Sequence, residues 1–277
     1  MNIPREELLS INTATVRKQW SLDKIIDGCV RHDIFRISPW RDQVHAIGLN
    51  VVAKKIRDNN LIVSGYCRGG MFTYESENEQ RRSQDDNRRA VDEAVTIGAA
   101  CLVLVVGGLP GTSKDIQSAR LQVRDGIAHL LEYSRQAGMP LAIEPLHPML
   151  AADRGCINTI SQANDLCDEL GGNGLGIAVD VYHTWWDPEL FSQIARAGSQ
   201  RILAFHICDW LVPTNSVYSD RGMMGDGIID IRKIRQALES TGYKGAHEVE
   251  IFSDSNWWYR DPDEVLITCK ERHLSNC

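Results

Sequence analysis

The feature that most constrains the fold is a regular alternation of short apolar runs with segments of helical periodicity. The runs are expected to be strands and cover residues 8–12, 33–38, 61–66, 101–107, 140–146, 176–182, 201–209 and 245–252. The helical segments cover residues 22–32, 41–58, 78–98, 115–137, 160–170, 188–197, 231–241 and 262–274. Apolar strands that are each followed by a helix predict a parallel sheet covered by helices. Because there are eight such units, an α/β fold of the (β/α)8 TIM barrel type is favoured over an open sheet.

The composition limits the class of protein. A length of 277 residues suits one barrel domain over residues 1–277, and 43% hydrophobic with 24% charged residues is typical of a globular protein rather than a disordered or fibrous one. No apolar run approaches the roughly 18 to 20 residues that span a bilayer. The eight cysteines are scattered without a C-x-x-C pair, which indicates reduced thiols. We therefore expect a cytoplasmic protein without a membrane partner.

The charge and the missing motifs indicate a small polar substrate. A net charge of −7 disfavours nucleic acids, whose phosphates are usually met by basic stripes. A phosphate-binding P-loop, a G-x-G-x-x-G motif and a serine-nucleophile elbow are all missing, so no nucleotide or flavin cofactor is expected. Homo-oligomers and hetero-oligomers both remain open.

Four consecutive strands end in an ionisable residue, and these residues carry the chemistry. The strand ends read Leu141-Ala-Ile-Glu144, Ile177-Ala-Val-Asp180, Leu203-Ala-Phe-His206 and Ala246-His-Glu-Val-Glu250. Side chains alternate between the two faces of a strand, so each ionisable residue shares a face with a small alanine on the first three strands. The small residues and the ionisable ones are therefore expected to point into the barrel, and the bulky ones outward.

A metal ion is the simplest way to accommodate these groups. Three carboxylates that converge at a barrel mouth repel one another unless a cation or shared proton compensates. Three carboxylates and an imidazole without a thiolate suit Mn²⁺ or Mg²⁺, with Co²⁺ or Zn²⁺ as alternatives. A single member such as Asp180 could instead belong to an internal ion pair. On the last strand the residues leave two choices open, because Glu248 and Glu250 share the inward face.

The chain resembles the sugar phosphate isomerase/epimerase superfamily of xylose isomerase-like barrels. The resemblance covers essentially the whole chain and is carried by the motifs Ile143-Glu-Pro-Leu-His-Pro148, Val179-Asp-Val-Tyr-His183, Phe205-His-Ile-Cys-Asp209, Asp220-Arg-Gly-Met-Met-Gly-Asp-Gly227 and Glu248-Val-Glu-Ile-Phe-Ser253. It implies one divalent metal ion held by Glu144, Asp180, His206 and Glu250, which favours Glu250 on the last strand. In the ketose epimerases of this group the first and last glutamates also move the proton, and these correspond to Glu144 and Glu250.

The superfamily also contains apurinic endonucleases of the endonuclease IV type, and the sequence disfavours that function. Those enzymes assemble three zinc ions with histidines at the third and fourth strands and a D-R-H motif after the seventh. Here residues 65–70 and 106–108 contain no histidine, and the third motif reads Asp220-Arg221-Gly222. The three-metal cluster cannot be built from these residues.

The resemblance therefore predicts a metal-dependent sugar isomerase or epimerase. A carboxylate would remove a proton next to a carbonyl that the metal polarises, in a keto sugar or a related polyol derivative. The main alternative is a lyase that eliminates a substituent from a 3-oxo-sugar, as in the α-subunits of C-glycoside deglycosidases, and such an enzyme can need a partner subunit. A non-catalytic barrel is disfavoured by the intact ligand set.

Several further residues are candidates for substrate contact or catalysis. His147, just beyond Glu144, is a candidate acid or base near neutral pH. The alternative is a purely structural role, in which it packs beside Pro148 or orients Glu144. His183 could bind substrate or an outer carboxylate, or be purely structural.

The long irregular segment 211–227 is a candidate lid, with a plain surface insertion as the alternative. Arg221 within it could hold a hydroxyl or phosphate oxygen, or form an exposed ion pair with Asp220. Tryptophans could form the wall against a sugar ring, Trp185 first among them, although core packing is at least as good a reading. The tryptophans in question are Trp185, Trp186, Trp257 and Trp258.

Overall fold

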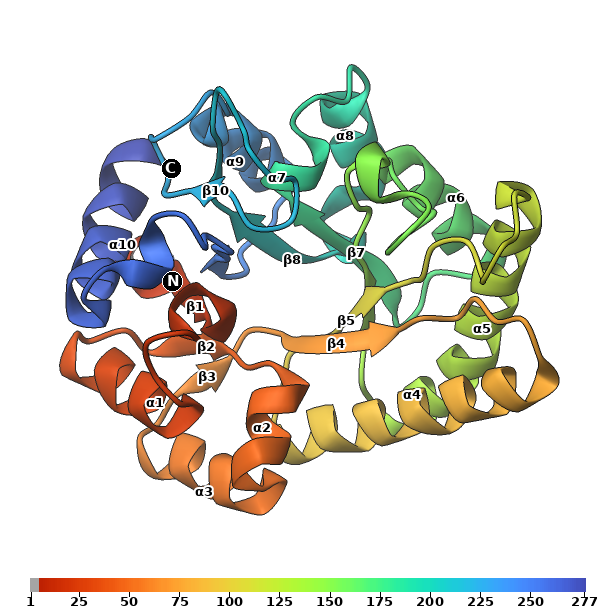
Figure 1. Ribbon diagram of the computed structural model, residues 1–277, viewed down its shortest axis with the longest axis horizontal. Coiled ribbons are helices and arrows are strands. Elements are labelled where there is room, and N and C mark those ends of the chain that lie inside the picture. The colour runs from red at the N-terminus through yellow and green to blue at the C-terminus, as the bar shows by residue number, and fades with distance from the viewer. Residues whose placement is uncertain (1–4) are drawn as a thin grey trace.

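The computed structural model describes residues 5–277, and its centre is a parallel sheet that nearly closes on itself (Figure 1). The nine strands of the sheet follow the order β3-β2-β1-β11-β8-β7-β6-β5-β4, and every pairing between them is parallel. Their bounds are β1 Leu9–Asn12, β2 Arg36–Ser38, β3 Ile62–Val63, β4 Tyr66–Gly70, β5 Leu102–Val105, β6 Leu141–Ile143, β7 Leu175–Asp180, β8 Ile202–Ile207 and β11 His247–Val249.

The two edges of this sheet meet, because β3 and β4 are halves of one barrel strand. An isolated parallel pairing joins Trp40, beyond β2, to Cys67 of β4, and a second joins Val63 of β3 to Ala99, before β5. These pairings close the ring between the second and fourth barrel positions. The predicted (β/α)8 barrel is thereby confirmed as a single-domain fold.

Some predicted strand bounds were wrong, and the reasons are local. The third strand was predicted over 61–66, but it is interrupted at Ser64, whose hydroxyl turns into the barrel to donate to Glu248 Oε2 at 2.9 Å, and then continues to Gly70. β6 stops before Pro145, which has no N–H for the ladder. β7 stops at Asp180, whose side chain accepts from Tyr182 N and starts a short helix.

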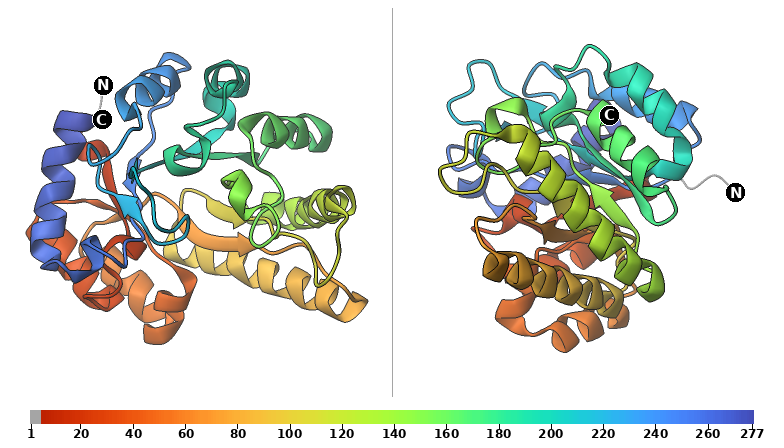
Figure 2. Two further views of the ribbon diagram at one scale, coloured as in Figure 1. Left: turned by 45° about the horizontal axis from the view of Figure 1, so that its top comes forward. Right: turned by 90° about the vertical axis from the view of Figure 1, so that its right-hand side faces the viewer.

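Helices cover the outside of the sheet, and the chain runs once around the barrel from its red to its blue end (Figure 2). The α-helices are α1 Leu22–Arg31, α2 Arg41–Ile47, α3 Leu49–Asp58, α4 Glu77–Ile97, α5 Ile116–Ala137, α6 Ile160–Leu170, α7 Val181–Thr184, α8 Leu190–Arg201, α9 Ile231–Ser240 and α10 Pro262–Asn276. Short 3-10 helices are η1 Arg5–Leu8, η2 Thr13–Val16, η3 Pro148–Leu150 and η4 Trp257–Tyr259. A two-stranded antiparallel pair, β9 Asp209–Trp210 and β10 Arg221–Gly222, follows the seventh barrel strand.

Two helix predictions needed correction. The helix predicted over 41–58 is divided into α2 and α3 by Gly48, whose φ of 107° no other residue type adopts readily. The helix predicted over 188–197 runs on to Arg201 as α8, with a kink at Gly198, where φ is 62°.

The packing confirms the predicted division between inward and outward side chains. Ala142, Ala178 and Ala204 lie in a small buried cluster with Cys67 and Val103, separate from the large core between sheet and helices. Their bulky neighbours on the same strands belong to that large core, except Leu203. Leu203 lies at a register shift between β7 and β8 and packs against the small cluster, so its predicted outward position was wrong. Small side chains therefore leave room inside the barrel beneath the strand ends.

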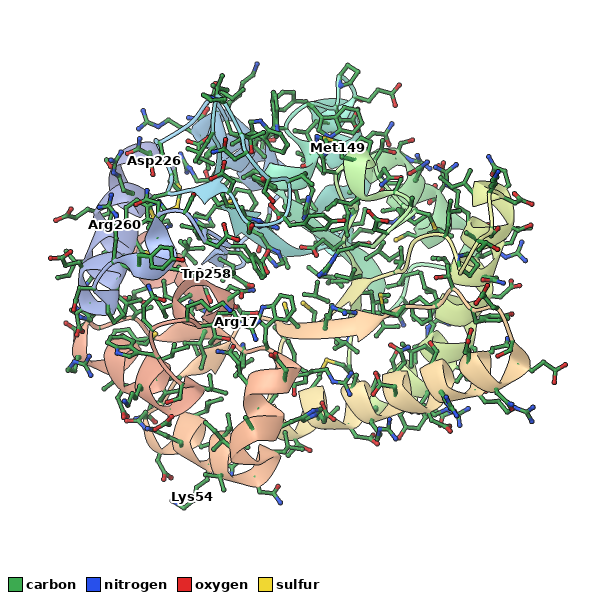
Figure 3. The ribbon with its side chains drawn as sticks, in the orientation of Figure 1. Arg17, Lys54, Met149, Asp226, Trp258 and Arg260 are labelled. Carbon is green, nitrogen blue, oxygen red and sulfur yellow. The ribbon has the colours of Figure 1, made fainter. Side chains whose placement is uncertain are left out.

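Charged side chains of the helices point to solvent, while Arg17, after η2, lies near the middle of the molecule. In Figure 3 Lys54 of α3 is at the outer rim and Arg17 is close to the centre. The eight cysteines are all buried, and none of them forms a disulfide within residues 5–277. Among residues 5–277, no helix is both long enough and apolar enough to cross a membrane.

Candidate metal centre and active site

Four ionisable side chains meet at the carboxyl ends of four neighbouring barrel strands. Glu144 follows β6, Asp180 ends β7, His206 lies in β8 and Glu250 follows β11. Each is buried, and each offers one ligand atom within 4.8 Å of the others. The strand register places Asp180 directly beside His206, so parallel pairing aligns the ends of the two strands. The four residues expected to converge do so.

His206 is held between two carboxylates. Its Nδ1 lies 2.8 Å from Glu144 Oε1 and 3.9 Å from Glu250 Oε2, on the side where the four ligand atoms converge. Its Nε2 faces the other way, 3.4 Å from Glu248 Oε1. Glu248 is therefore one layer deeper in the barrel, near enough to attract His206 Nε2 but without a hydrogen bond to it, and Glu250 is the member of the cluster.

Asn12, at the end of β1, links these two glutamates and was missed from the sequence. Its Nδ2 donates to Glu248 Oε1 at 2.8 Å and to Glu250 Oε1 at 2.9 Å. Its side-chain oxygen accepts from Trp40 Nε1 at 2.7 Å. The only available signal was a polar residue at the end of a weakly apolar first strand.

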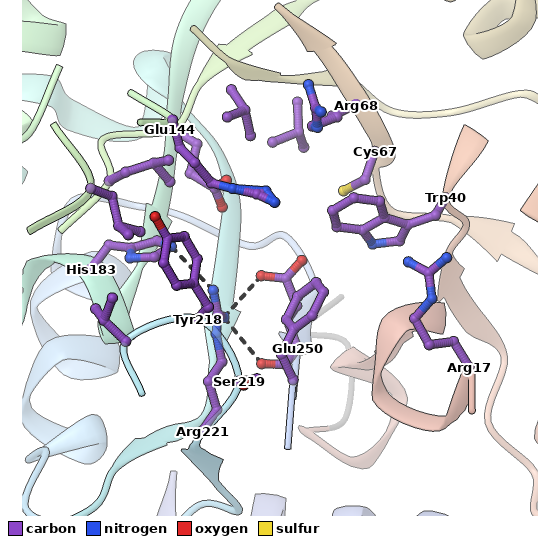
Figure 4. Close-up of a pocket in the computed structure, with 17 residues that line it drawn as sticks. Arg17, Trp40, Cys67, Arg68, Glu144, His183, Tyr218, Ser219, Arg221 and Glu250 are labelled. Atoms are coloured by element: carbon purple, nitrogen blue, oxygen red, sulfur yellow. Dashed lines mark hydrogen bonds and ion pairs between the residues drawn. The ribbon is translucent and has the colours of Figure 1, made fainter. Parts of the chain in front are cut away.

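Arg221 enters the centre from the segment 211–227 (Figure 4). Its Nη1 lies 2.9 Å from both Asp180 Oδ2 and Glu250 Oε2, and its Nη2 lies 3.1 Å from His183 Nε2. The alternative of an exposed ion pair with Asp220 is wrong, because Arg221 is buried and Asp220 instead accepts from Asn215 N and Ser255 Oγ. Burial of the segment's middle was not predictable from its polar sequence.

The pKa values reflect a site crowded with negative charge. Burial raises the pKa of Glu250 to about 8, with Glu144 adding to the rise and Arg221 opposing it. Burial alone would lower the pKa of His206, but Glu248, Glu144 and Glu250 outweigh it and hold this pKa well above its usual range. Protons on Glu250 and His206 thus partly neutralise the cluster.

Asp180 and His183 respond differently to the same surroundings. Burial opposes ionisation of Asp180, but the positive charges of Arg221, His183 and His206 prevail, so its pKa is lowered. Burial lowers the pKa of His183 to about 3, which keeps its imidazole neutral. Since Arg221 donates to His183 Nε2, the hydrogen of the neutral ring is on Nδ1, and this atom has no partner among the described residues.

The donor set fits one divalent metal ion. Three carboxylates and one imidazole lie close enough to share a single ion, and oxygen-rich sets of this kind bind hard divalent cations. A cation would also replace the protons that now balance the buried carboxylates. His206 Nε2 points away from the four ligand atoms and toward Glu248. In metal sites, a carboxylate in this second position commonly orients the histidine that binds the metal.

A cavity of about 330 Å³ opens above this centre. Glu144 and Glu250 are on its lining, whereas Asp180 and His206 are fully buried beneath it. The remaining lining residues are Arg17, Trp40, Cys67, Arg68, Val103, Val105, Leu146, Leu150, Arg154, His183, Val217, Tyr218, Ser219, Arg221 and Phe252. The predicted lid segment thus forms part of the wall through Val217, Tyr218, Ser219 and Arg221.

His147 and the four predicted tryptophans lie outside that lining. His147 stacks on Trp210 with ring centroids 4.9 Å apart, and its Nδ1 accepts from Met149 N at 3.3 Å. Burial lowers the pKa of His147. Trp185 also packs near Trp210, with centroids 5.6 Å apart. The catalytic role of His147 and the substrate contact of Trp185 stay predictions.

The other three tryptophans make structural contacts. Trp186 Nε1 donates to His183 O, Trp257 Nε1 donates to Asp226 Oδ2 at 3.2 Å, and Trp258 Nε1 donates to Ala14 O. The aromatic residues on the cavity wall are instead Trp40, Phe252 and Tyr218, and the rings of the first two meet edge to face at 5.6 Å. Trp40 follows the second strand, where barrel loops contribute to the site, so its position in the sequence was a usable signal.

Comparison with known proteins identifies relatives over most of the chain. The family model described as xylose isomerase-like TIM barrel matches residues 27–269. An inosose isomerase of Halalkalibacterium halodurans is 25% identical over 148 residues, which are 52% of this chain and only half, 50%, of that relative's length. An L-ribulose-5-phosphate 3-epimerase, UlaE, of Escherichia coli is 24% identical over 219 residues, which are 78% of this chain and 72% of that protein.

Solved structures share the fold. The protein SMc04130 of Sinorhizobium meliloti 1021 is 57% identical, with a TM-score of 0.96 over 98% of this chain and 99% of that one. The IolI protein, in a structure with a bound zinc atom, is 18% identical, with a TM-score of 0.82 over 96% of each chain. Its likeness concerns the fold. With the match over residues 27–269, the chain belongs to the xylose isomerase-like TIM barrel family.

Proposed function

We propose that the chain is a divalent-metal-dependent enzyme that isomerises or epimerises a keto sugar or a related polyol derivative. In this proposal Glu144, Asp180, His206 and Glu250 hold one ion, with Mn²⁺ as the first choice, and Glu144 and Glu250 also transfer the proton. A divalent ion bound there would polarise a substrate carbonyl and acidify the neighbouring C–H bond.

The observation that carries this proposal is the unequal access of the four residues. Only the two glutamates are on the cavity lining, while Asp180 and His206 lie behind them. The glutamates follow β6 and β11, which are separated in the sheet by β7 and β8, so they approach the cavity from two directions. Two carboxylates at different sides of one substrate suit removal of a proton and its return to another position.

The chemistry follows from those positions. One glutamate removes the proton next to the carbonyl, and the electron pair moves to the carbonyl oxygen. Return of a proton to the opposite face of the same carbon gives an epimer. Return of a proton to the former carbonyl carbon, with transfer of the neighbouring hydroxyl proton to the former carbonyl oxygen, gives an isomer. The small barrel interior and the buried walls limit access of water to this exchange.

Two neighbouring side chains are proposed to bind substrate oxygens. His183 lines the cavity with an Nδ1–H that has no partner among residues 5–277, and Arg221 lines it with an Nε in the same condition. Buried donors of this kind are costly unless something accepts their hydrogen bonds. Hydroxyl oxygens of a sugar would do so.

The relatives support this class of reaction. The names of two of them, an inosose isomerase and an L-ribulose-5-phosphate 3-epimerase, describe isomerisation and epimerisation. The zinc atom bound to the IolI protein supports testing Zn²⁺ beside Mn²⁺, Mg²⁺ and Co²⁺.

The test is hydrogen exchange in D₂O. Metal-loaded protein is incubated with ketoses, ketose phosphates and 3-oxo-glycosides, and C–H exchange and products are followed by NMR. We expect exchange at the carbon next to the carbonyl and an isomer or epimer as product. Glu144→Gln and Glu250→Gln should abolish both, whereas Glu264→Gln, at an exposed glutamate of α10, should not.

Other outcomes assign the chain elsewhere. Exchange accompanied by loss of a substituent would make the enzyme a lyase. Cleavage of abasic DNA without sugar exchange would revive the endonuclease function. Absence of any exchange with every metal and sugar would overturn the proposal.

A further inference from the structure

Two arginines on the cavity wall lack an anionic partner within residues 5–277. Among residues 5–277, the guanidinium groups of Arg68 and Arg154 form neither a hydrogen bond nor an ion pair, although Arg154 lies 5.6 Å from the Tyr218 ring centre. The other two arginines of the cavity are neutralised, because Arg17 pairs with Asp42 and Arg221 pairs with two carboxylates of the metal centre. Arg68 and Arg154 are thus the cavity's uncompensated positive charges.

A β-bulge directs Arg68 into the cavity. In the pairing of β4 with β5, Cys67 is opposite Val103 and Gly69 is opposite Leu104, so Arg68 is the extra residue. Regular alternation would send Arg68 and Cys67 to opposite faces, but both line the cavity. Bulges often direct a side chain toward a site in this way.

The loop that carries Arg154 is fixed by close backbone contacts. Gly107 N donates to Arg154 O at 3.0 Å, and Leu109 N donates to Ala152 O at 2.7 Å. Gly108 allows this approach, because a Cβ on it would lie only 2.1 Å from Ala152 O. The backbone at each arginine is therefore fixed by pairing with a neighbouring segment.

Their mutual position is unfavourable without an anion. Burial lowers the pKa of Arg68, and the charge of Arg154 lowers it further. Asp86, whose charge acts on Arg68, pairs with Arg41 and Arg89, and Asp153, next to Arg154 in the chain, accepts from the Tyr218 hydroxyl. In Figure 4, Arg68 is on the wall that carries Cys67 and Trp40, across the cavity from His183.

We propose that the substrate carries an oxyanion, a phosphate ester or a carboxylate, which Arg68 and Arg154 bind while its carbonyl end faces Glu144 and Glu250. This inference rests on the proposed function for the carbonyl end, but the anion site stands on its own residues. Guanidinium groups match the planar, two-oxygen edge of such anions. The site gives an acidic chain of net charge −7 a local attraction for a negatively charged sugar.

The experiment compares matched substrates and matched variants. Metal-loaded wild type, Arg68→Met, Arg154→Met and the control Arg57→Met, at an exposed position of α3, are assayed for C–H exchange with a neutral ketose, its phosphate ester and the corresponding sugar acid. Arg68→Lys and Arg154→Lys keep the charge and serve where a methionine variant fails to fold. Binding of inorganic phosphate is measured by calorimetry on the same proteins.

We expect wild type and Arg57→Met to prefer one anionic sugar over the neutral one. In Arg68→Met and Arg154→Met, the ratio of the exchange rate of the anionic sugar to that of the neutral sugar should fall at least about tenfold. The dissociation constant for phosphate should rise by a similar factor, because charge-assisted hydrogen bonds are lost. The favoured arm, ester or acid, identifies the anion. Phosphate held by the metal alone would bind equally to all variants, and this result would overturn the anion site.

The two proposals fail separately. Equal exchange of neutral and anionic sugars, unchanged in both arginine variants, would overturn the anion site and leave the isomerase proposal intact. Phosphate binding that depends on both arginines, with no exchange of any sugar, would support the anion site and overturn the isomerase proposal.

Discussion

At the scale of single residues, Glu250 is the group whose surroundings conflict most. It lies near Glu144 and Asp180, yet Arg221 and Asn12 both donate to it. A cation that takes the place of its proton would relieve this conflict, and loss of its charge should weaken the hold on that cation.

Glu250→Gln should therefore lower both metal occupancy and activity while the fold is retained. The glutamine side chain keeps the shape and the hydrogen bond from Asn12 but offers a neutral oxygen. Metal content by mass spectrometry and circular dichroism of the purified variant are the measurements. Wild-type metal content would show that the assignment on the last strand is wrong.

Glu248 acts on the metal centre through His206. Its carboxylate is fixed by Asn12 and by Ser64 Oγ and faces His206 Nε2. Because outer carboxylates orient a ligating imidazole, Glu248→Gln should weaken metal affinity by about 10- to 100-fold with all four ligands in place. Titration with Mn²⁺ measures this change, and an unchanged dissociation constant would contradict the role.

His147 has a direct test of its predicted catalytic role. Burial lowers the pKa of its imidazole, which makes it a neutral proton acceptor near pH 7. His147→Asn retains a side chain that can accept from Met149 N, so the fold should persist, and turnover should be abolished with metal content unchanged. Turnover at the wild-type rate would leave His147 with its packing contact on Trp210.

The sequence predicted the strand-end residues well but not their partners. Side-chain alternation is a local property, so the inward position of Glu144, Asp180 and His206 followed from two-residue periodicity. The contacts of Arg221 and Asn12 join segments far apart in the chain, and no local pattern encodes them. Arg68 was missed because the third strand was predicted to end at residue 66, whereas β4 continues to Gly70 with a bulge at Arg68.

At the scale of elements, the strand β4 is the least regular part of the barrel, and it tolerates the fewest residue types at its positions. Gly70 has φ of 111°, and a Cβ on it would lie 2.0 Å from Val105 O of the neighbouring strand. Gly98, the C-cap of α4, also has a positive φ of 76°, but a Cβ there would meet open space. Comparison of alanine variants at the two glycines therefore distinguishes the cost of a positive φ from the cost of a steric clash.

Gly98→Ala should reduce the free energy of unfolding by roughly 1–2 kcal/mol, the usual cost of a left-handed conformation for an L-residue. Gly70→Ala should reduce it further, by at least about 3 kcal/mol in total, because β4 must also move away from β5. Urea denaturation followed by circular dichroism gives both values. Equal losses for the two variants would mean that β4 can shift without cost.

Element boundaries were the weakest part of the sequence prediction, and each error has a local cause. Amphipathic periodicity continues through Gly48, so one helix was predicted over α2 and α3. The positive φ of Gly48 ends the first helix and separates it from the second. The short helix α7 follows from Asp180, which caps it with the same carboxylate that belongs to the metal centre. A residue of the candidate metal centre thus also determines where a strand ends and a helix begins.

At the scale of the whole molecule, the number and order of units were predictable because most of the strands are buried on both sides, although Ile62 of β3 is exposed. That burial requires nearly continuous apolar runs, which are visible in the sequence and were enough for the barrel. The cavity was not visible, because its walls combine Arg17 after η2, the bulged strand β4, the loop at 151–155 and the segment 211–227. Only the closed barrel brings these segments to one opening.

The charge of the centre links metal binding to the stability of the entire fold. Glu250, with a pKa raised from 4.5 to about 8, binds a proton in the folded state that the unfolded chain has released, so its contribution to stability falls as pH rises toward 8. His206 has a raised pKa and loses its contribution in the same direction, above 6.5. The lowered pKa of His183 matters only below 6.5, where unfolded histidine gains a proton.

Chelated protein should therefore lose thermal stability as pH rises from 6.5 to 8, while Mn²⁺ should restore it increasingly over the same range. Protons compete with the ion for Glu250 and His206, so the apparent affinity rises with pH, and an ion that binds only the folded state stabilises it more. The measurement is the difference in Tm between Mn²⁺-loaded and EDTA-treated protein at each pH, which cancels the titration of groups outside the centre. In Glu250→Gln this difference should be small and nearly independent of pH. If the Tm difference in wild type is constant or shrinks toward pH 8, metal binding does not depend on deprotonation of this cluster. That result would contradict the assignment of the metal ion to these four residues.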